Sequence, residues 1–474
     1  MERTLAAETL QKIGKKVTLK GWVGTVRDHG KITFLDLRDS SGLVQCVGQN
    51  FPKLTNESVV EVQGEVAARP AKLVNLNLPT GKVEVKIAEI KILSLAKEQL
   101  PLPVSGDGRE IDEEVRLKYR YLDLRRERLQ RNLRVRSEYV QAARKYLFSQ
   151  GFVEIETPYL SKSTPEGSRD FVVPSRKHPG KFYALPQAPQ QYKQLLMVAG
   201  FEKYFQIARA FRDEDLRADR GFEHTQIDLE MSFVERGDVM GLVEGMTIAA
   251  AEAVGAKIAK KPFPVLTYQD SIKKYGDDKF DLRNEKEKKE GVLSFAWVVD
   301  FPFFKKDAEG KWTFTHNPFS APKTAEDEKN LLAGKDIENI LTSQYDLVCN
   351  GMEVAGGSIR AHNPKVLQAT YKIMGYSENQ MQESVGHMLE AFSYGAPPHG
   401  GCAQGFERLL MAYLGENYIR EIQAFPMTGR GRTSVMDAPS EITPKQLKEL
   451  GISIVGSKEK INLPPNRRKP PKRR

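Results

Sequence analysis

Five short stretches near the start of the chain alternate polar and apolar residues, and they constrain the fold more than any other feature. They are "KVTLKGWVGTVR", "KITFLDLRD", "GLVQCVG", "SVVEVQGEVAARP" and "GKVEVKIAEIKIL". Such alternation is typical of strands with one buried face, and the turn signals "DHGK", "DSSG" and "LPTG" lie between them. So many strands in so short a segment predict a small Greek-key barrel, which we assign to residues 1–103.

A five-stranded barrel of this kind, the OB fold, binds single-stranded nucleic acid on an open face. Phe34 and Gln45 are candidates for that face. An aromatic ring there can stack on a base, and an amide can pair with a base edge. The alternative for Phe34 is an ordinary place in the barrel core.

At 474 residues the chain is too long for one ordinary core, so a further domain must follow the barrel. The Pro/Gly-rich "LPLPVSG" comes after the last strand, and we expect a hinge or linker over 104–130. Beyond it, several strand patterns succeed one another without a crossover helix. This order predicts an α+β domain over 131–435, built on a mostly antiparallel sheet flanked by helices.

Cysteine usage and hydropathy exclude several protein classes. Cys46, Cys349 and Cys402 stand far apart, so neither a zinc ribbon nor a disulfide framework is supported. No apolar run approaches the length of a membrane span, and the first residues lack a signal-peptide core. We therefore expect a cytoplasmic protein without a membrane partner.

The net charge is +10, and six positive charges fall in the last eight residues, "RRKPPKRR". Because prolines break this stretch, we expect residues 436–474 to form a C-terminal extension with a disordered basic tail. Two interpretations of the tail stay open: a solubilising end, or sequence-independent contact with nucleic-acid phosphates.

Residues 211–230, "FRDEDLRADRGFEHTQIDLE", are half charged although apolar runs flank them. The flanking patterns predict a strand–loop–strand hairpin. A solvated surface hairpin would account for the charges. The alternative is a site for a ligand that carries phosphate and carboxylate groups.

Five further stretches decide between these interpretations. "TPEGSRDF", "ALPQAPQQYKQLLM", "FRDEDLRADR", "NGMEVAGGSIR" and "GAPPHGGCAQGFERL" follow the barrel in this order. Together they resemble the bacterial aspartyl-tRNA synthetase family, which belongs to the class II aminoacyl-tRNA synthetases, over nearly the whole chain. Motif 1 of that class corresponds to about 131–158, motif 2 to about 204–234 and motif 3 to about 398–415.

The resemblance implies ATP-dependent aspartylation of tRNA(Asp) by a homodimer. Aspartate and ATP would first form aspartyl-adenylate, and the aspartyl group would then pass to the 3′-terminal adenosine of the tRNA. Positioning and charge neutralisation, rather than a protein nucleophile, would carry the first step.

The resemblance also implies roles for individual residues. Arg212 would bridge the α-phosphate and the attacking carboxylate, and Arg408 would hold the γ-phosphate, because a guanidinium fork suits both groups. Asp346 and Glu353 would hold Mg²⁺, a hard cation that prefers oxygen ligands. The full ATP-binding set is Arg212, Asp213, Glu214, Gly221, His224, Gln226, Glu353, Gly405, Phe406, Glu407 and Arg408.

A pocket for aspartate needs fixed cations for the short side-chain carboxylate, and the resemblance gives this role to Lys193 and Arg360. Without it, Lys193 would be interpreted as a helix-surface charge. The full aspartate-binding set is Glu166, Gln190, Lys193, Arg212, Asp228, His316 and Arg360.

The anticodon set implied on the barrel is Arg27, His29, Phe34, Gln45 and Gly81. The anticodons for aspartate and asparagine differ only in their third base. In this family a histidine at the position of His29, with a glycine in the facing loop, often accompanies charging of both tRNA(Asp) and tRNA(Asn). A histidine can donate or accept a hydrogen bond. We therefore predict relaxed tRNA choice; the alternative is a specific enzyme in which His29 is an ordinary turn residue.

The chain departs from the family pattern in several places. The large insertion domain between motifs 2 and 3 is absent. Ala188 replaces a serine, Asn317 a histidine, His224 an adenine-stacking aromatic and Gly221 a glutamine. These changes bear on ATP affinity more than on the type of reaction.

Three other functions compete with aspartylation of tRNA. A lysyl-tRNA synthetase needs acids in its amino-acid pocket, and an asparaginyl-tRNA synthetase would not require Lys193. A non-catalytic, RNA-binding paralogue is the third. The joint presence of Arg212, Asp346, Glu353 and Arg408 argues against it.

Overall fold

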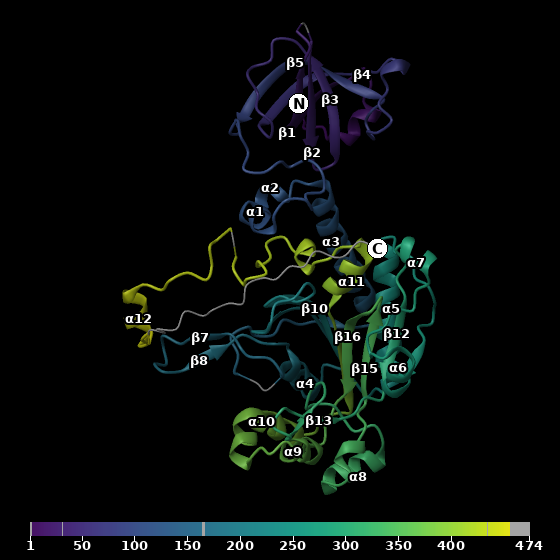
Figure 1. Ribbon diagram of the computed structural model, residues 1–474, viewed down its shortest axis with the longest axis vertical. Coiled ribbons are helices and arrows are strands. Elements are labelled where there is room, and N and C mark those ends of the chain that lie inside the picture. The colour runs from purple at the N-terminus through teal and green to yellow at the C-terminus, as the bar shows by residue number, and fades with distance from the viewer. Residues whose placement is uncertain (1, 31, 164–165, 434, 456–474) are drawn as a thin grey trace. The chain divides into compact units, whose positions relative to one another are not determined.

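The computed structural model describes residues 2–30, 32–163, 166–433 and 435–455. The chain divides into two compact units, Met1–Pro103 and Val104–Arg474. Figure 1 colours the chain from purple at the N-terminus to yellow at the C-terminus. The basic run predicted as a disordered tail lies outside the described residues.

In the described part of the first unit, five strands close into a barrel of order β1-β2-β3-β5-β4. They are β1 (Lys16–Asp28), β2 (Thr33–Asp39), β3 (Gly42–Gly48), β4 (Val59–Ala68) and β5 (Val83–Ser94), with short 3-10 turns η1 (Ala7–Gln11) and η2 (Ala71–Leu73). The predicted five-stranded OB barrel is therefore confirmed. Each strand gives the core a residue with no exposed surface, namely Val23, Leu35, Val44, Val62 and Val85.

The second unit is built on a sheet that has eight strands within the described ranges. In spatial order they are β11 (Val265–Thr267), β12 (Phe295–Val299), β15 (Gln344–Cys349), β16 (Met352–Ile359), β17 (His399–Gln404), β10 (Glu223–Ser232), β9 (Lys203–Phe211) and β6 (Val153–Glu154). Pairing is antiparallel from β12 to β9 and parallel at the two edges. The predicted α+β domain on a largely antiparallel sheet is confirmed.

Two small hairpins, β7–β8 (Val172–Pro174, Phe182–Ala184) and β13–β14 (Phe304–Lys306, Trp312–Phe314), lie outside this sheet. The helices are α1 (Glu113–Lys118), α2 (Arg120–Asp123), α3 (Glu127–Ser149), α4 (Gln190–Val198), α5 (Arg236–Ala253), α6 (Tyr268–Tyr275), α7 (Glu285–Lys289), α8 (Ala325–Ala333), α9 (Pro364–Ile373), α10 (Glu378–Ser393), α11 (Phe406–Leu414) and α12 (Pro444–Leu450), with 3-10 turns η3 (Ile337–Asn339) and η4 (Ile419–Ile422).

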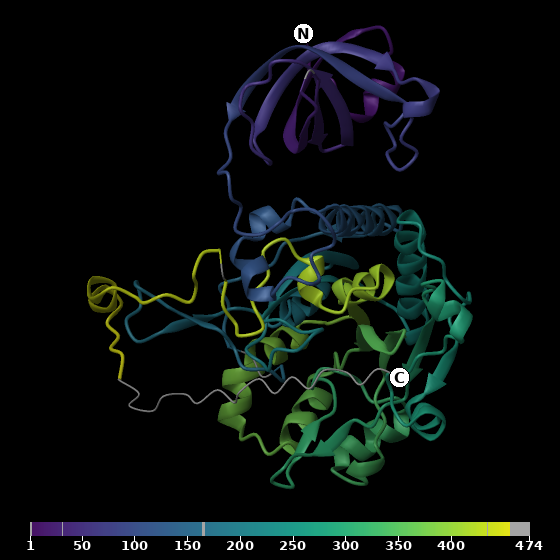
Figure 2. The same cartoon turned by 45° about the horizontal axis from the view of Figure 1, so that its top comes forward.

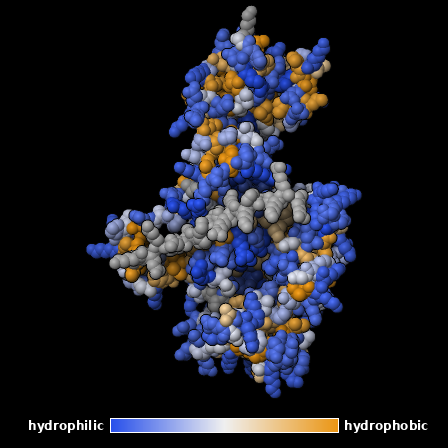
Figure 3. Space-filling model, viewed as in Figure 1, coloured by the Kyte–Doolittle hydropathy of each residue, from blue (hydrophilic) through white to orange (hydrophobic). Residues whose placement is uncertain are grey.

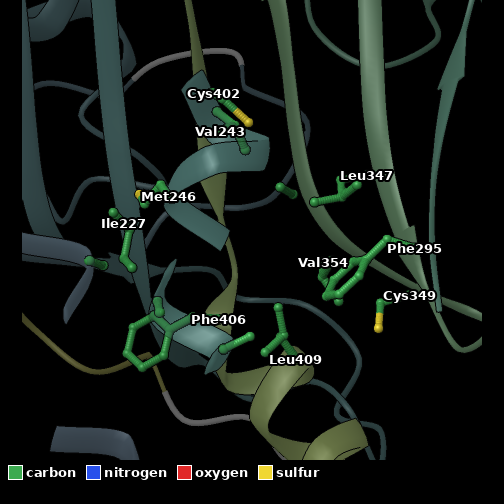
Figure 4. Close-up of a cluster of buried hydrophobic side chains, with 14 of the residues drawn as sticks. Ile227, Val243, Met246, Phe295, Leu347, Cys349, Val354, Cys402, Phe406 and Leu409 are labelled. Atoms are coloured by element: carbon green, nitrogen blue, oxygen red, sulfur yellow. The ribbon is translucent and has the colours of Figure 1, made fainter. Parts of the chain in front are cut away.

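One face of the large sheet is apolar, and α3, α5 and α11 pack on it (Figure 2). Ile227 of β10, Val354 of β16 and Cys402 of β17 belong to the same buried cluster as Phe406 and Leu409 of α11 (Figure 4). Since strand side chains alternate between faces, the intervening residues point to the opposite side of the sheet. On β10 these are polar, and this second face carries the site described below.

The segment 104–130, expected to be a linker, is instead folded and partly buried in the second unit. Asp123 is fully buried between Arg116, Arg120 and Arg126, at distances of 3.0, 2.8 and 2.7 Å. Arg116 also pairs with Glu421 at 2.8 Å. The charges of this segment thus neutralise one another inside the fold. No helix in the described ranges combines the length and apolar character needed to cross a bilayer.

Candidate active site

The polar face of the large sheet carries a cleft with about 750 Å³ of space that opens to solvent. Figure 3 shows hydrophilic residues gathered over the middle of this unit, where β10 and β16 lie. Most of the predicted ATP-binding residues line this cleft, namely Arg212, Glu214, Gly221, His224, Gln226, Glu353, Gly405, Glu407 and Arg408. The charged hairpin therefore borders a cleft, which excludes its interpretation as a plain surface loop.

The register of the sheet gives this face a floor of small residues between carboxylates. Asp228 of β10 pairs with Ala403 of β17, which pairs with Gly356 of β16, which pairs with Asp346 of β15. In the next row, a Cβ at Gly401 would come within 1.9 Å of Glu230 Oε2. Glycine is needed at position 401 because the carboxylate of Glu230 occupies the space of a side chain.

Arg212 and Arg408 enter the cleft from different elements. Arg212 follows β9, and its Nε donates to the Gln187 carbonyl at 3.3 Å. Arg408 lies in the first turn of α11, where Nε is 3.2 Å from Asp219 Oδ2 and Nη1 donates to the Glu353 carbonyl at 3.2 Å. Burial lowers the pKa of Arg212, and Glu214 and Glu166 oppose that effect.

Two residues of β10 complete the wall beneath the arginines. Burial, and then the positive charges of Arg212 and Arg408, hold the pKa of His224 well below its ordinary value, so its imidazole is neutral. Gln226 is buried, and its Oε1 has no hydrogen-bond partner within the described residues. This wall offers a flat neutral ring and a buried acceptor to a ligand.

Asp346 and Glu353, the predicted Mg²⁺ ligands, converge over Gly356. A Cβ built on Gly356 would lie 3.0 Å from Asp346 Oδ1 and 3.5 Å from Glu353 Oε1. Asp346 Oδ2 is buried without a hydrogen-bond partner in the described chain. Burial and the charge of Glu353 raise the pKa of Asp346 well above its ordinary value. A converging pair of carboxylates fits a hard divalent cation that takes its other ligands from phosphate and water.

Further along the same face, Lys193 and Arg360, the cations predicted for the aspartate pocket, form a buried cluster of charges with two carboxylates. Lys193 Nζ is 2.8 Å from Asp228 Oδ2 and 3.2 Å from Glu230 Oε2. Arg360 donates to both carboxylate oxygens of Glu230, from Nε to Oε1 at 2.8 Å and from Nη2 to Oε2 at 3.1 Å. Lys193 is 1% exposed, which excludes the alternative of a helix-surface charge.

Glu230 belongs to this pocket but is missing from the residues predicted from the sequence. It is fully buried, and although burial alone would raise its pKa, Arg360 and Lys193 bring the pKa down to about 2. Its neighbour Asp228 keeps a raised pKa, chiefly through burial, and Asp228 Oδ1 has no hydrogen-bond partner in the described residues. The pocket thus holds one well-paired acid and one with a free acceptor.

The other residues predicted to bind the substrate aspartate lie around the carboxylate pair and the buried charge cluster. His316 Nδ1 is 3.6 Å from Asp346 Oδ2, and burial lowers the pKa of this histidine to about 4. Gln190 donates to Gln194 at 3.0 Å. Glu166 borders a second hollow together with Ala188 and His387.

Two residues predicted to bind ATP, Phe406 and Asp213, are not among the described residues that line the cleft. Phe406 is fully buried in the apolar core (Figure 4). Its ring stacks on that of Tyr139, with 5.9 Å between the ring centroids. Asp213 turns outward and pairs with Arg169 at 3.6 Å. Next to Phe406, Glu407 is held by Arg136 of α3 at 2.6 Å.

In the barrel unit, residues predicted to contact RNA share the outer face of β2 and β3. Phe34 is half-buried and stands outside the barrel core, which is formed by Leu35 and Leu37. Gln45 pairs across the strands with Asp36, which Arg27 holds through two bonds of 2.8 and 2.9 Å. The face therefore presents an aromatic ring, an amide and a fixed guanidinium.

His29 and Gly81 flank this face from opposite ends of β3. His29 lies in the β1–β2 turn, next to the pair of Thr33 and Gly48, and its ring meets Phe34 edge-on at 5.6 Å. Gly81 follows Thr80, whose hydroxyl donates to the Leu43 carbonyl at 2.5 Å. The two loops therefore lie at opposite ends of β3.

Comparison with known proteins identifies the family. Residues 112–429 match the family described as "tRNA synthetases class II (D, K and N)", and residues 17–93 match "OB-fold nucleic acid binding domain". "Aspartate--tRNA(Asp/Asn) ligase" of Phenylobacterium zucineum is 40% identical over 93% of this chain and 96% of its own length. The chain belongs to the class II aspartyl-tRNA synthetase family. A protein of the same name from Chlorobaculum parvum is also 40% identical, over 93% of this chain and 94% of its own.

Solved structures of this family share the fold. An aspartyl-tRNA synthetase from Entamoeba histolytica superimposes with a TM-score of 0.70 at 23% identity, covering 90% of this chain and 91% of that one. An asparaginyl-tRNA synthetase from Pyrococcus horikoshii, complexed with asparaginyl-adenylate, gives a TM-score of 0.70 at 24% identity, with 90% and 98% covered.

The family relatives are longer than this chain. The alignment with the Phenylobacterium protein spans 574 positions, 100 more than the chain has residues, so at least that many positions of the relative have no counterpart here. This is the result expected if the insertion domain of bacterial aspartyl-tRNA synthetases is absent.

Proposed function

We propose that this chain attaches aspartate to tRNA in two steps, by forming aspartyl-adenylate from aspartate and ATP and then transferring the aspartyl group to the terminal adenosine. One observation carries the proposal: the arginine-lined cleft and the cluster of buried charges lie next to each other on one face of the sheet. Gln226 lies in the cleft of the two arginines, and Asp228 and Glu230 follow on the same strand and face. Residues two apart on a strand are about 7 Å apart, which suits the halves of an aminoacyl-adenylate.

In the cleft, Arg212 and Arg408 bind the phosphates. Arg212 contacts the α-phosphate and the attacking carboxylate, and so reduces the repulsion between two anions as they approach. Arg408 holds the γ-phosphate at the far end of the cleft. Their donors make contacts of 3.2 to 3.3 Å with protein oxygens, and charge-assisted bonds to phosphate are shorter and stronger.

In the buried pocket, Lys193 and Arg360 receive the side-chain carboxylate of aspartate, and Asp228 Oδ1 receives its ammonium. Lys193 and Arg360 are already paired with Glu230 and Asp228, so the pocket is nearly neutral before aspartate binds. Asparagine would leave these cations with a neutral amide, which supports a preference for aspartate over asparagine.

A Mg²⁺ ion fits between Asp346 and Glu353, where two carboxylates converge and one oxygen has no partner. Bound there, the ion would supply charge neutralisation to the polyphosphate. Asp346 and Glu353 hold and orient it from β15 and β16.

The tRNA partners are tRNA(Asp) and tRNA(Asn). The name of the two relatives, aspartate–tRNA(Asp/Asn) ligase, includes both tRNAs and supports relaxed choice. The position of His29 beside Phe34, at the edge of the RNA face, supports it too. Strict specificity for tRNA(Asp) is the second candidate.

The enzyme acts as a homodimer. Motif 1 leaves apolar side chains exposed on α3 and β6: Phe148 is 53% exposed and Val153 is 47% exposed. Large apolar residues exposed within one short segment favour a protein interface over contact with water.

The decisive assay is exchange of labelled pyrophosphate into ATP. We expect exchange that requires aspartate and is not supported by asparagine or lysine. Purified protein that binds both substrates but gives no aspartate-dependent exchange would leave the non-catalytic, RNA-binding paralogue as the better account.

A further inference from the structure

Arg136 of α3 contacts both side walls of the nucleotide cleft. Its Nη1 donates to Glu407 Oε1 at 2.6 Å, and its Nη2 donates to Thr225 Oγ1 at 3.0 Å. The guanidinium carbon also lies 4.8 Å from the centre of the Phe406 ring. One side chain therefore connects α3 with α11 on one side and with β10 on the other.

The α11 wall depends on the contact to Glu407. This residue is 1% exposed and precedes Arg408 in the first turn of the helix. Glu407 Oε2 accepts a second bond from Gln423 at 3.0 Å, so both carboxylate oxygens are held. The direction in which Arg408 leaves the helix is fixed through these contacts.

The β10 wall depends on the contact to Thr225, which stands between His224 and Gln226 in the strand. Both neighbours line the cleft. The Thr225 hydroxyl also accepts from Arg209 at 3.2 Å, and Arg209 in turn pairs with Glu223 at 2.6 Å. This end of β10 is thus tied to α3 and to β9.

We propose that Arg136 is a positioning residue for ATP, which holds the Arg408 wall and the His224–Gln226 wall at the separation that the nucleotide requires. It acts through Glu407 and Thr225. This inference rests on the proposed function of the cleft, and it adds a residue of a helix that supplies none of the described side chains lining the cleft.

An arginine is required because the role needs two donors at fixed positions and a flat group over Phe406. A lysine has one nitrogen on a flexible stem, so it can satisfy Glu407 or Thr225 but not hold both in one geometry. Arg136→Lys keeps the charge and should retain only part of the effect.

α3 offers a matched control in Arg144. This arginine also binds a glutamate through two nitrogens, with Nε and Nη2 at 3.0 and 2.9 Å from Glu154 Oε1. It is not among the described residues that line the cleft. Arg144→Gln therefore removes a second, more exposed arginine–glutamate pair from the same helix without touching either wall.

The test measures ATP and aspartate dissociation constants separately by calorimetry, for wild type, Arg136→Gln, Arg136→Lys and Arg144→Gln. We expect Arg136→Gln to weaken ATP binding by about tenfold or more, since small displacements of positioned groups are costly, with aspartate binding unchanged. Arg136→Lys should lie between it and wild type, and Arg144→Gln should match wild type.

Wild-type ATP affinity in Arg136→Gln, or equal weakening of ATP and aspartate, would overturn the proposal. If Arg136→Gln fails to fold, Thr225→Val serves instead: it keeps the pair of Arg136 with Glu407, and an unchanged ATP affinity in it would overturn the proposal too. The ATP measurement is made without aspartate, so it is independent of pyrophosphate exchange. Absent exchange in wild type counts against the proposed function, and an unaltered ATP affinity counts against Arg136.

Discussion

Lys193 donates to Asp228 across 2.8 Å, and both side chains are almost completely buried. The ammonium therefore already has a carboxylate partner before any substrate enters. The substrate aspartate must therefore add its own carboxylate to an ion pair that already exists. Its affinity depends on how Lys193 divides its hydrogen bonds between Asp228 and the substrate.

Replacing Lys193 with methionine should weaken aspartate binding far more than ATP binding. It should also lower the free energy of unfolding by ~3–5 kcal/mol, because Asp228 and Glu230 lose a buried counter-charge. Separate titrations of the two substrates, with urea unfolding, check both effects. Equal losses for aspartate and ATP would contradict the carboxylate-binding role.

Arg408→Ala should abolish adenylate formation and leave the fold intact. Arg408 contacts Asp219 and a carbonyl at the cleft wall, not the apolar core, so little packing is lost. Pyrophosphate exchange measures the activity, and circular dichroism measures the fold. Arg408→Lys, which keeps a point charge, should retain some exchange; normal exchange in the alanine variant would sink the assignment.

His29→Leu should reduce charging of tRNA(Asn) more than charging of tRNA(Asp). His29 sits at the edge of the RNA face, where a polar ring can bond either pyrimidine, and one such contact is worth about 1–3 kcal/mol. Transcripts of both tRNAs charged with wild type and variant provide the measurement. Wild type that ignores tRNA(Asn) even at high enzyme concentration would leave strict specificity as the answer.

Val153→Asp should convert a dimer into an inactive monomer. The comparison is Leu332→Asp on α8, since both residues are 47% exposed and only Val153 lies in motif 1. Light scattering after gel filtration gives the mass of each variant. An active monomer in wild type, or a monomer produced equally by both changes, would refute the interface.

Lowering the pH should abolish the difference in unfolding free energy between wild type and Glu230→Gln. The folded pKa of Glu230 is about 2 against an ordinary 4.5, so the unfolded chain binds its proton first, and protonation favours unfolding. The contribution of Glu230 is therefore complete above pH 4.5 and declines as the pH falls toward 2. The two unfolding free energies should converge below pH 4.5 by up to ~1.4 kcal/mol per pH unit.

Glu285→Gln provides the control for this pH series, because Glu285 is largely exposed at the start of α7. The unfolding free energies of wild type, Glu230→Gln and this variant are measured across the same pH range. A gap between wild type and Glu230→Gln that widens in acid would be incompatible with a lowered carboxyl pKa.

The sequence predicted the elements with the clearest two-residue period. The barrel strands and the 204–234 hairpin fold as expected, into β1–β5 and into β9 with β10. The same period contains a signal for the missed pocket residue: Gln226, Asp228 and Glu230 are polar at every second position, between the apolar Ile227, Leu229 and Met231. Three polar residues on one strand face indicate a shared site.

Pairings between distant elements were not predictable in this way. Nothing local in the sequence shows that Arg136 meets Glu407, 271 residues away, or that Phe406 turns into the core while Arg408 enters the cleft. The folded state of 104–130 was missed for the same reason. Its arginines look solvated until the partner segment near Glu421 is brought beside them.

That last pairing has a consequence for synthesis of the chain on the ribosome. Arg120 donates to the carbonyl of Arg420, 300 residues later, and Arg116 needs Glu421. At 5–20 residues per second, about 15 to 60 s pass between translation of the two segments. During that interval the nascent chain carries arginines whose counter-charges have not yet been synthesised. The segment around Arg116 and Arg120 can therefore reach its native packing only after the segment around Glu421 has been translated.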